Sequence, residues 1–305
     1  MTARNAVLLI AHGSPENVDD IPEFLRLVTN GRGVPESVVK EIQHRYSLIG
    51  CSPLTCHTVG QANGVHRETG LPTYIGMRNW HPFLADTLAQ MTRDGIEHVV
   101  AICLAPQNSR TSVGLYKKAL GEKQVPFSID FIESWHDHPL LIEAFAENHR
   151  AAYRIACEEA KSELPVLFTA HSVPQRTITE GDPYETESRE TAALVARKLG
   201  LDNSKWRFAF QSQGMSGGEW LGPTVESTLE QYAREGKKGV FFQPIGFVCD
   251  HVEILYDIDI AFRDFAERLG MRIWRAESLN NSVSFARAIA DIVRTRIAAG
   301  AASKA

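Results

Sequence analysis

The sequence predicts an α/β protein built from two similar domains, each with a four-stranded parallel sheet flanked by helices. Two features of the chain lead to this prediction. Short, continuously apolar runs alternate with amphipathic segments, which is typical of parallel strands buried on both faces and joined by crossover helices. One strand-and-turn pattern also occurs twice within 305 residues, a length that holds two such domains comfortably.

Eight apolar runs fit strands, because they are short and rich in Val, Ile and Phe. They span residues 6–11, 72–77, 98–104, 127–132, 166–170, 206–211, 239–244 and 271–275. The segments between them have the apolar spacing of amphipathic helices. These segments span residues 20–29, 36–49, 53–68, 82–94, 112–120, 139–162, 186–199, 224–235, 251–269 and 282–298.

The repeated pattern consists of an apolar strand that runs into Ala-His, small residues and then Pro. It reads LLIAHGSP at 8–15 and LFTAHSVP at 167–174. Strand exits in general favour Gly, Ser and Pro, but that preference does not explain a repeated Ala-His. A duplication would explain it. In that case His12 and His171 lie at equivalent sheet edges, where they could face one cleft.

The bulk composition argues against several classes of protein. The chain has a net charge of −5 and no run rich in Lys or Arg, so nucleic acid is not an expected partner. No apolar run reaches the ~20 residues that span a bilayer, and the N-terminus has no signal-peptide cleavage pattern. The five cysteines are scattered, which indicates free thiols and a reducing, cytoplasmic location.

The segment QPIGFVCDHVEILYDIDIAFRDF (243–265) gathers polar groups where a buried strand turns into a helix. Ligands of open α/β sheets bind at such carboxyl ends of strands. Asp250 and Glu253 fit a capping box, in which their role would be structural. Glu253 and Asp257 are also four residues apart and share a helical face, so a line of carboxylates could pass cations or protons inward. His171, at another strand end, supplies an imidazole that can accept a proton or bind a metal.

A second group of polar residues lies in the first half of the chain. Arg32, Arg45 and Tyr46 precede a helix start at Ser52 and Pro53. Ser followed by Pro is ordinary helix-start chemistry, but exposed backbone N–H groups with arginines nearby would also bind a carboxylate. No phosphate-binding P-loop, G-x-G-x-x-G or G-x-S-x-G motif occurs, so nucleotide binding and serine hydrolysis are unsupported.

Several of these stretches together resemble the ferrochelatase family, whose members insert Fe²⁺ into a porphyrin. The stretches are RYSLIGCSPL, LFTAHSVP, SQGMSGGEWLGPTVEST and PIGFVCDHVEILYDIDI, and the resemblance covers nearly the whole chain. The first loop, AHGSP, is similar to the bacterial branch that uses coproporphyrin III. The resemblance therefore implies insertion of Fe²⁺ into coproporphyrin III to give coprohaem, a lyase step of haem biosynthesis, with release of two pyrrole protons.

The resemblance also implies how the chain is organised. It implies two Rossmann-like, chelatase-type domains at 1–115 and 116–281, with the C-terminal helix 282–300 packing back on the first and the porphyrin in the cleft between them. His171 and Glu253 match the family's catalytic residues and would face each other across the pyrrole nitrogens, where both would also contact the metal. The expected substrate-binding residues are His12, Arg32, Arg45, Tyr46, Ser52, Ser112 and Tyr116.

The chain departs from the family pattern at several positions. Ala261 stands where the line of carboxylates would continue, so a metal relay along the helix is less supported than chemistry at its start. Met215 stands where many members have Arg. His12 matches a position that is commonly Tyr, Met or Leu, and it could ligate the iron of the product.

The expected ligands are a porphyrin and Fe²⁺ as substrates, with other haem-pathway enzymes as possible partners. The chain lacks the cysteine-bearing tail of members with an iron–sulfur cluster, so neither a cluster nor another permanently bound cofactor is expected. Three alternatives stay open: protoporphyrin IX as the substrate, cobalt insertion into sirohydrochlorin (the opening LLIAHGS also resembles small cobaltochelatases), and a non-catalytic tetrapyrrole-binding protein.

Overall fold

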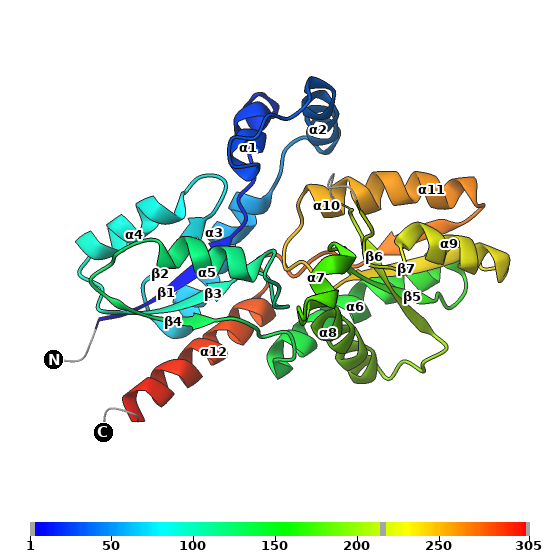
Figure 1. Cartoon of the computed structure of the whole chain (residues 1–305). Helices are drawn as coiled ribbons and strands as arrows, with labels where there is room; N and C mark the ends of the chain where they lie inside the picture. The colour runs from blue at the N-terminus through cyan, green and yellow to red at the C-terminus, as the bar shows by residue number, and fades with distance from the viewer. Residues whose placement is uncertain (1–3, 214–217, 303–305) are drawn as a thin grey trace. The chain divides into compact units, whose positions relative to one another are not determined.

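A computed structural model describes residues 4–213 and 218–302 and divides the chain into two compact units (Figure 1). Unit 1 comprises Met1–Ala105, Ser112–Ser134 and Asn280–Ala305. Unit 2 comprises Pro106–Thr111 and Trp135–Leu279. Each unit contains one four-stranded sheet in which every strand pairs in parallel with its neighbours. The predicted fold class is therefore confirmed.

The sheet of unit 1 has the strand order β2-β1-β3-β4. Its strands are β1 (Asn5–Ala11), β2 (Thr73–Met77), β3 (His98–Cys103) and β4 (Ser128–Ile132). Residues 6–10 of the inner strand β1 are completely buried, because helices cover both faces of a parallel sheet. The helices are η1 (Val18–Asp20), α1 (Ile21–Val28), α2 (Glu36–Ile49), α3 (Leu54–Thr69), α4 (Leu84–Arg93), α5 (Val113–Gly121) and α12 (Val283–Ala302).

The C-terminal helix α12 packs against α3 within unit 1. Small residues let the two helices approach closely, since a Cβ added at Gly64 would lie 2.9 Å from the Cβ of Ala286. Just before α12 begins, the side chain of Gln61 donates a 2.9 Å hydrogen bond to the carbonyl oxygen of Asn280. The last helix of the chain, α12, thus belongs to unit 1, together with the first strand, β1.

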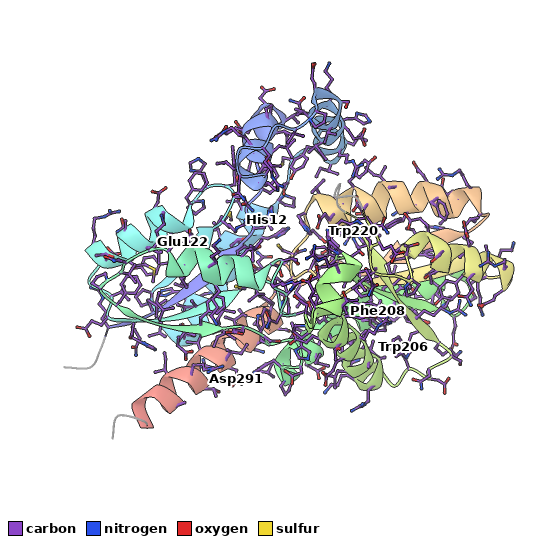
Figure 2. The ribbon with its side chains drawn as sticks, in the orientation of Figure 1. His12, Glu122, Trp206, Phe208, Trp220 and Asp291 are labelled. Atoms are coloured by element: carbon purple, nitrogen blue, oxygen red, sulfur yellow. The ribbon has the colours of Figure 1, made fainter. Side chains whose placement is uncertain are left out.

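The sheet of unit 2 repeats the same arrangement with the order β6-β5-β7-β8. Its strands are β5 (Val166–His171), β6 (Trp206–Gln211), β7 (Gly239–Pro244) and β8 (Arg272–Arg275). Trp206 and Phe208 lie on its edge strand β6 (Figure 2). Its helices are α6 (Pro139–Ala160), α7 (Gln175–Thr179), α8 (Tyr184–Leu199), α9 (Val225–Arg234), α10 (Val252–Leu255), a π-helical segment η2 (Asp257–Phe262) and α11 (Arg263–Arg268).

The predicted strands agree with those of the structure to within one residue at each end. The predicted helix 251–269 differs, because it divides into α10, η2 and α11. In the π-helical part, the amide of Ala261 donates to the carbonyl of Tyr256, five residues earlier, at 2.9 Å. Helix α7 has no counterpart in the prediction, since a five-residue helix shows no apolar period.

The division into units also differs from the boundary expected between residues 115 and 116. That boundary falls inside helix α5. Residues 112–134 belong to unit 1 because β4 pairs in parallel with β3, from His98 opposite Ser128 to Ile102 opposite Ile132. The fourth strand of the first sheet thus comes from beyond the expected boundary. The expected cleft between the two units stays a prediction.

Over residues 4–213 and 218–302, no helix has both the length and the apolar character needed to cross a membrane.

The turn after β7 lies unusually close to β5. Gly246 donates a backbone hydrogen bond to the carbonyl of Thr169 at 3.3 Å. A Cβ added at Gly246 would lie 2.8 Å from the Cβ of Ala170 and 2.9 Å from its Cα. Only glycine leaves room for this approach, so the turn can follow the end of β5.

We expect Gly246→Ala to lower the free energy of unfolding by about 1–3 kcal/mol, because the added methyl group forces the backbone to shift. Urea unfolding followed by circular dichroism measures this change. Gly121→Ala is the control, since it lies in helix α5 with no atom within 4 Å of an added Cβ. It should be neutral or stabilising by about 0.5–1 kcal/mol. Equal stability of the two variants would contradict the prediction.

Candidate active site

The candidate site of unit 2 lies at the carboxyl edge of its sheet. Strands β5 and β7 are parallel neighbours, so their carboxyl ends meet at the same edge. His171 ends β5. After β7, the amide of Ile245 donates to the carbonyl of Thr169 at 2.9 Å, and the chain then enters α10, which carries Glu253. The fold therefore brings together two residues that are 82 positions apart in the sequence.

His171 and Glu253 form an ion pair, with 3.3 Å between Nε2 of the imidazole and Oε1 of the carboxylate. The second carboxylate oxygen, Oε2, lies 3.4 Å from Nε2 of His251. Glu253 thus lies between two imidazoles. The side chains of His171 and Glu253 keep 30% and 34% of their surface exposed, so a ligand can reach both. The structure thus brings the two residues into direct contact; that they face each other across the pyrrole nitrogens stays a prediction.

A backbone contact fixes which nitrogen of His171 exchanges a proton. Nδ1 is hydrogen-bonded to the carbonyl oxygen of Ser172. Because a carbonyl oxygen only accepts hydrogen bonds, Nδ1 carries a hydrogen in both protonation states of the ring. Nε2, which faces Glu253, is therefore the atom that gains or loses a proton. The hydroxyl of Tyr184 donates to the carbonyl oxygen of His171 at 3.0 Å and holds the backbone there.

The two side chains shift each other's pKa. Burial disfavours the charged imidazolium of His171, but the charge and hydrogen bond of Glu253 outweigh burial and raise the pKa of His171. Burial likewise raises the pKa of Glu253, yet the neighbouring imidazoles of His171 and His251 hold that pKa well below its usual range. An anion favours a nearby cation in this way whenever both are shielded from water. Each side chain therefore favours the charged form of the other.

These shifts fix how the pair affects stability at different pH. The raised pKa of His171 means that its contribution is complete below about pH 6.5 and is lost as pH rises through the folded-state pKa. The lowered pKa of Glu253 means that its contribution is present above the unfolded-state pKa and is lost as pH falls through the folded-state value. The ion pair therefore stabilises unit 2 most between the unfolded-state pKa values of Glu253 and His171, and its contribution declines outside that window toward the two folded-state values.

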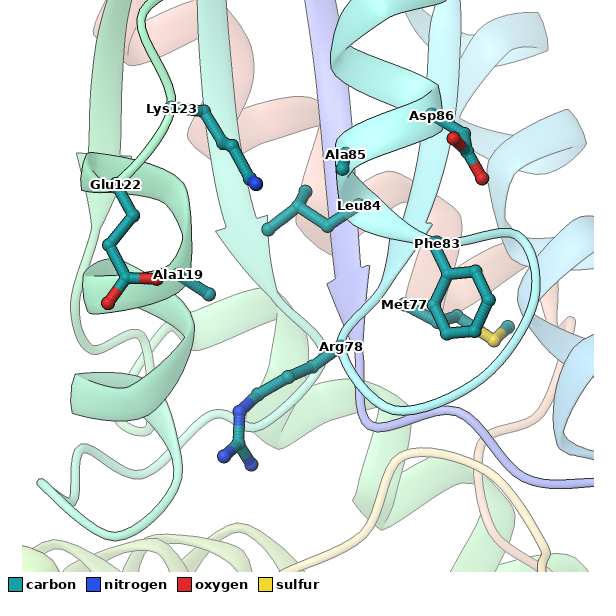
Figure 3. A pocket seen from close by; sticks show the side chains of 9 residues that line it. All are labelled: Met77, Arg78, Phe83, Leu84, Ala85, Asp86, Ala119, Glu122 and Lys123. Carbon is teal, nitrogen blue, oxygen red and sulfur yellow. The ribbon is translucent and has the colours of Figure 1, made fainter. Parts of the chain in front are cut away.

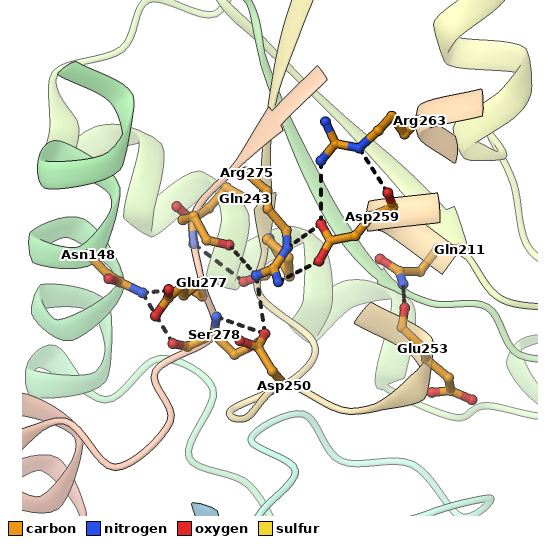
Figure 4. A network of polar contacts seen from close by, with 12 residues as sticks. Asn148, Gln211, Gln243, Asp250, Glu253, Asp259, Arg263, Arg275, Glu277 and Ser278 are labelled. Carbon is orange, nitrogen blue, oxygen red and sulfur yellow. Dashed lines mark hydrogen bonds and ion pairs between the residues drawn. The ribbon is translucent and has the colours of Figure 1, made fainter. Parts of the chain in front are cut away.

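Two residues at the end of β6 hold the helix segment that carries Glu253. Gln211 donates from Nε2 to the carbonyl oxygen of Glu253 at 2.7 Å (Figure 4), and the hydroxyl of Ser212 donates to the carboxylate of Asp257. Ser212 has a positive φ of 60°. Residues other than glycine adopt this conformation rarely, and those that do are often found at functional sites. Asp257 begins the π-helical segment η2, and such segments also occur often at functional sites.

The alternative reading of Asp250 as a helix cap is wrong. The N-cap residue of α10 is His251, and no side chain caps the helix. The carboxylate of Asp250 accepts hydrogen bonds from Nη1 of Arg275 and from the amide of Ser278, both at 3.2 Å. Asp250 therefore belongs to a buried polar network rather than to a capping box.

The predicted substrate-binding residues all lie in unit 1. His12 follows β1 and is exposed, with Nδ1 2.9 Å from the carbonyl oxygen of Gly13 (Figure 2). Tyr46 on α2 is buried, and its hydroxyl lies 2.8 Å from the hydroxyl of Ser14. The loop after β1 and helix α2 are therefore joined beside His12.

The other five residues of this set lie in varied surroundings. Arg32 is exposed and donates from Nε to the carbonyl of Thr29 at 3.1 Å, while Arg45 pairs with Glu41 at 2.9 Å. The remaining members are less accessible: they are the buried Ser52, the half-buried N-cap residue Ser112 and the buried Tyr116. The substrate-binding role of the set stays a prediction.

Sequence reasoning did not single out an aromatic row next to His12. The ring of His12 meets Phe24 edge to face at 5.9 Å, Phe24 meets Trp80 at 6.1 Å, and Trp80 meets His81 at 5.5 Å. Gly13 allows this contact, because it has a φ of +86° and an added Cβ would lie 2.7 Å from the backbone nitrogen of Trp80. The aromatic residues in NWHPF, directly after a strand, were the signal that could have revealed the row.

The structure also bears on the Gly-rich loop and on metal binding. In the Gly-rich loop SQGMSGGEWLGP, residues 214–217, including Met215, lie outside the described residues. In the described part of the chain, no group of three or more His, Cys, Asp or Glu side chains is arranged to hold a metal ion.

Unit 1 also contains a cavity of about 300 Å³ between the start of α4 and the end of α5 (Figure 3). None of the predicted site residues lines this cavity. Its walls are formed by Met77, Arg78, Phe83, Leu84, Ala85, Asp86, Ala119, Glu122 and Lys123.

Comparison with known proteins identifies the family. The model of the ferrochelatase family matches residues 4–297 of the chain. The chain belongs to the ferrochelatase family. A ferrochelatase from Acidobacterium capsulatum is 50% identical, with 97% of this chain and 95% of that protein covered. A coproporphyrin III ferrochelatase from a Geobacillus species is 34% identical, with 95% and 97% covered.

Solved structures support the fold of this ferrochelatase-family chain. The sirohydrochlorin chelatase SirB from Bacillus subtilis, solved with Fe³⁺, aligns with a TM-score of 0.59 over 95% of this chain and 94% of its own. The two sequences are 9% identical, so the likeness shows the chelatase fold alone. The resemblance read from the sequence motifs is confirmed. As a ferrochelatase, the chain acts in porphyrin metallation, with a porphyrin and iron as substrates.

We expect Glu253→Gln to lower the pKa of His171. The carboxylate charge and hydrogen bond that raise this pKa are then lost, and burial, which favours the neutral ring, is opposed only by the hydrogen bond to Ser172 and the charge of Asp257. Titration of the His171 ring nitrogens by ¹⁵N NMR measures the change. Glu190→Gln is the control with the same loss of charge, since Glu190 pairs with His136 instead. If His171 titrates at the same pH in both variants, its raised pKa does not come from Glu253.

Proposed function

We propose that this chain inserts Fe²⁺ into coproporphyrin III, with release of two pyrrole protons, and that His171 and Glu253 carry the reaction. The observation that carries this proposal is the ion pair at the carboxyl edge of the unit 2 sheet, 3.3 Å between Nε2 and Oε1. The choice of coproporphyrin III over protoporphyrin IX is supported by relatives named coproporphyrin III ferrochelatase, such as the Geobacillus protein at 34% identity, and by the AHGSP loop.

Metal insertion needs a base, because two pyrrole N–H protons must leave as Fe²⁺ enters the ring. His171 is suited to this role, since Nε2 can accept a proton while Nδ1 stays bonded to the carbonyl of Ser172. The proton accepted there is stabilised by the carboxylate of Glu253. A general base placed in this way contributes roughly 10²–10⁴-fold to a rate.

Glu253 has a second role in this proposal, because its carboxylate is an oxygen ligand suited to Fe²⁺ on its way into the ring. The carboxylate stays ionised, since the neighbouring imidazoles hold its pKa well below its usual range. Asp257 lies one helical turn further along, and the hydroxyl of Ser212 holds its carboxylate. A metal or proton could thus meet two anions in succession, after which Ala261 ends the line of carboxylates.

The residues of unit 1 would bind the porphyrin. Coproporphyrin III carries more propionate groups than protoporphyrin IX, and guanidinium groups bind carboxylates with two parallel hydrogen bonds. Arg45 lies on α2 and Arg32 in the segment between α1 and α2, and neither is buried. We assign them to propionate binding and His12 to the face of the ring, where its imidazole can ligate the iron of the product. A cytoplasmic location is also proposed, and it is supported by the five cysteines, which form no disulfide in the described residues.

The substrate assignment is tested by a spectroscopic titration of the protein with coproporphyrin III, followed by anaerobic Fe²⁺. We expect conversion to the iron-porphyrin spectrum, faster than with protoporphyrin IX. The same assay with Co²⁺ and sirohydrochlorin tests the cobaltochelatase alternative. Turnover of sirohydrochlorin alone, or faster turnover of protoporphyrin IX, would overturn the choice of coproporphyrin III.

His171→Ala and Glu253→Ala should each reduce the insertion rate by at least ~100-fold, while coproporphyrin III still binds. The reason is that each removes a group that handles the proton or the metal, not the propionates. His136→Ala is a matched control, since His136 likewise pairs with carboxylates, 3.4 Å from Glu187 and 3.1 Å from Glu190. If all three variants keep the native rate, the protein binds tetrapyrroles without catalysis by this pair.

A further inference from the structure

A buried arginine at the end of β8 joins two carboxylates that flank Glu253. Arg275 donates to Asp259 through Nε at 2.7 Å and through Nη2 at 2.8 Å, a two-pronged contact with both carboxylate oxygens (Figure 4). Its third nitrogen, Nη1, donates to Asp250 at 3.2 Å. The side chains of Arg275 and Asp250 are only 12% and 9% exposed. The guanidinium is thus held by two anions, of which Asp250 is buried and Asp259 is 27% exposed.

The two anions bound by Arg275 lie on either side of Glu253 in the sequence. Asp250 lies three residues before Glu253, and Asp259 lies six residues after it. One guanidinium therefore holds both ends of the segment that carries Glu253. The carbonyl of Asp259 is held in turn by Nε of Arg263 at 2.8 Å, and Asp250 also accepts from the amide of Ser278 at 3.2 Å.

The segment between the two anions has little ability to hold its own shape. Helix α10 is only four residues long, and no side chain caps it. The π-helical segment η2 follows it directly. Helices of one turn are not stable by themselves, because nucleation costs more than one hydrogen bond returns. Contacts from outside the segment must therefore fix where Glu253 lies. Arg275, on strand β8, makes such contacts through its ion pairs with Asp250 and Asp259.

We propose that Arg275 is a positioning residue for metal insertion, which sets the place of the Glu253 carboxylate relative to Nε2 of His171. The inference rests on the proposed roles of His171 and Glu253. Arg275 donates no bond to either residue in the described contacts and acts through Asp250 and Asp259. Rigid placement matters because a displacement of about 1 Å at a reacting group can cost about 100-fold in rate.

The test compares Arg275→Met and Arg275→Lys with the native chain in steady-state iron insertion. We expect Arg275→Met to lower kcat by about 10–100-fold, as for other residues that orient metal-contacting groups. KM for coproporphyrin III should stay unchanged, because the predicted porphyrin contacts lie in unit 1. Arg275→Lys should restore kcat only in part, since an ammonium lacks the planar fork that spans both oxygens of Asp259.

The matched control is Arg272→Met, on the same strand. Arg272 pairs with Glu159 at 2.7 Å, and its side chain is 59% exposed, so its loss removes an arginine from β8 without touching the Glu253 segment. We expect native kcat and KM. A drop in kcat equal to that of Arg275→Met would overturn the inference, because it would trace the effect to β8 in general.

A second variant keeps the test decisive if Arg275→Met does not fold. Removing one partner from a buried ion pair leaves uncompensated charge, which here falls on Asp250 and Asp259. The triple variant Arg275→Met, Asp250→Asn, Asp259→Asn removes that charge together with the two-pronged contact. We expect it to fold, to bind coproporphyrin III and to show the same loss of kcat. Native kcat in the folded triple variant would show that Arg275 only stabilises the fold.

The outcomes also separate this inference from the proposed function. If His171→Ala and Glu253→Ala lose activity while Arg275→Met keeps it, the catalytic pair stands and the positioning role of Arg275 falls. If His171→Ala and Glu253→Ala keep the native rate, the proposed catalytic roles of this pair fall, and with them the reason to place Glu253.

Discussion

The parallel pairing of β5 with β7 is the constraint on which the candidate site depends. It places the end of β5, with His171, beside the turn that leads into α10. The close approach at Gly246, where an added Cβ would lie 2.8 Å from Ala170, sets how near that turn can come. This backbone arrangement makes the ion pair of His171 and Glu253 possible, because it brings an imidazole and a carboxylate from distant parts of the sequence to one edge of the same sheet.

The charges around this edge form two connected layers. In the layer open to solvent, Glu253 lies between two imidazoles, and these hold its pKa well below its usual range. In the buried layer, Arg275 holds Asp250 and Asp259 on either side of the same short helix. A buried ion pair is a poor source of net stability. Its value here is specificity, since it selects one arrangement for a short helical segment that no side chain caps.

The sequence allowed much of this fold to be predicted, because a parallel strand buried on both faces must be continuously apolar. VLLIA in β1 and VLFTA in β5 are examples. His171 could be singled out for the opposite reason, as a polar side chain at the end of an apolar strand, and Glu253 because it lies in the polar run DHVE that follows β7. Arg275 could not, since in MRIWR it looks like any strand residue and its partner Asp250 lies 25 positions away. The π-helical turn and the boundary after β4 also depend on packing between segments, which local patterns do not encode.

If His171 is the base, as proposed, the hydrogen bond from its Nδ1 to the carbonyl of Ser172 limits the order of events in one turnover. The ring exchanges protons through one nitrogen only, so it can take up a single proton at a time. A porphyrin that gives up two protons must therefore be deprotonated in sequence if this imidazole is the only acceptor. The imidazolium formed first has to pass its proton on before the second transfer. On this view the rate of proton export from the site, and not only the entry of iron, sets an upper limit on catalysis.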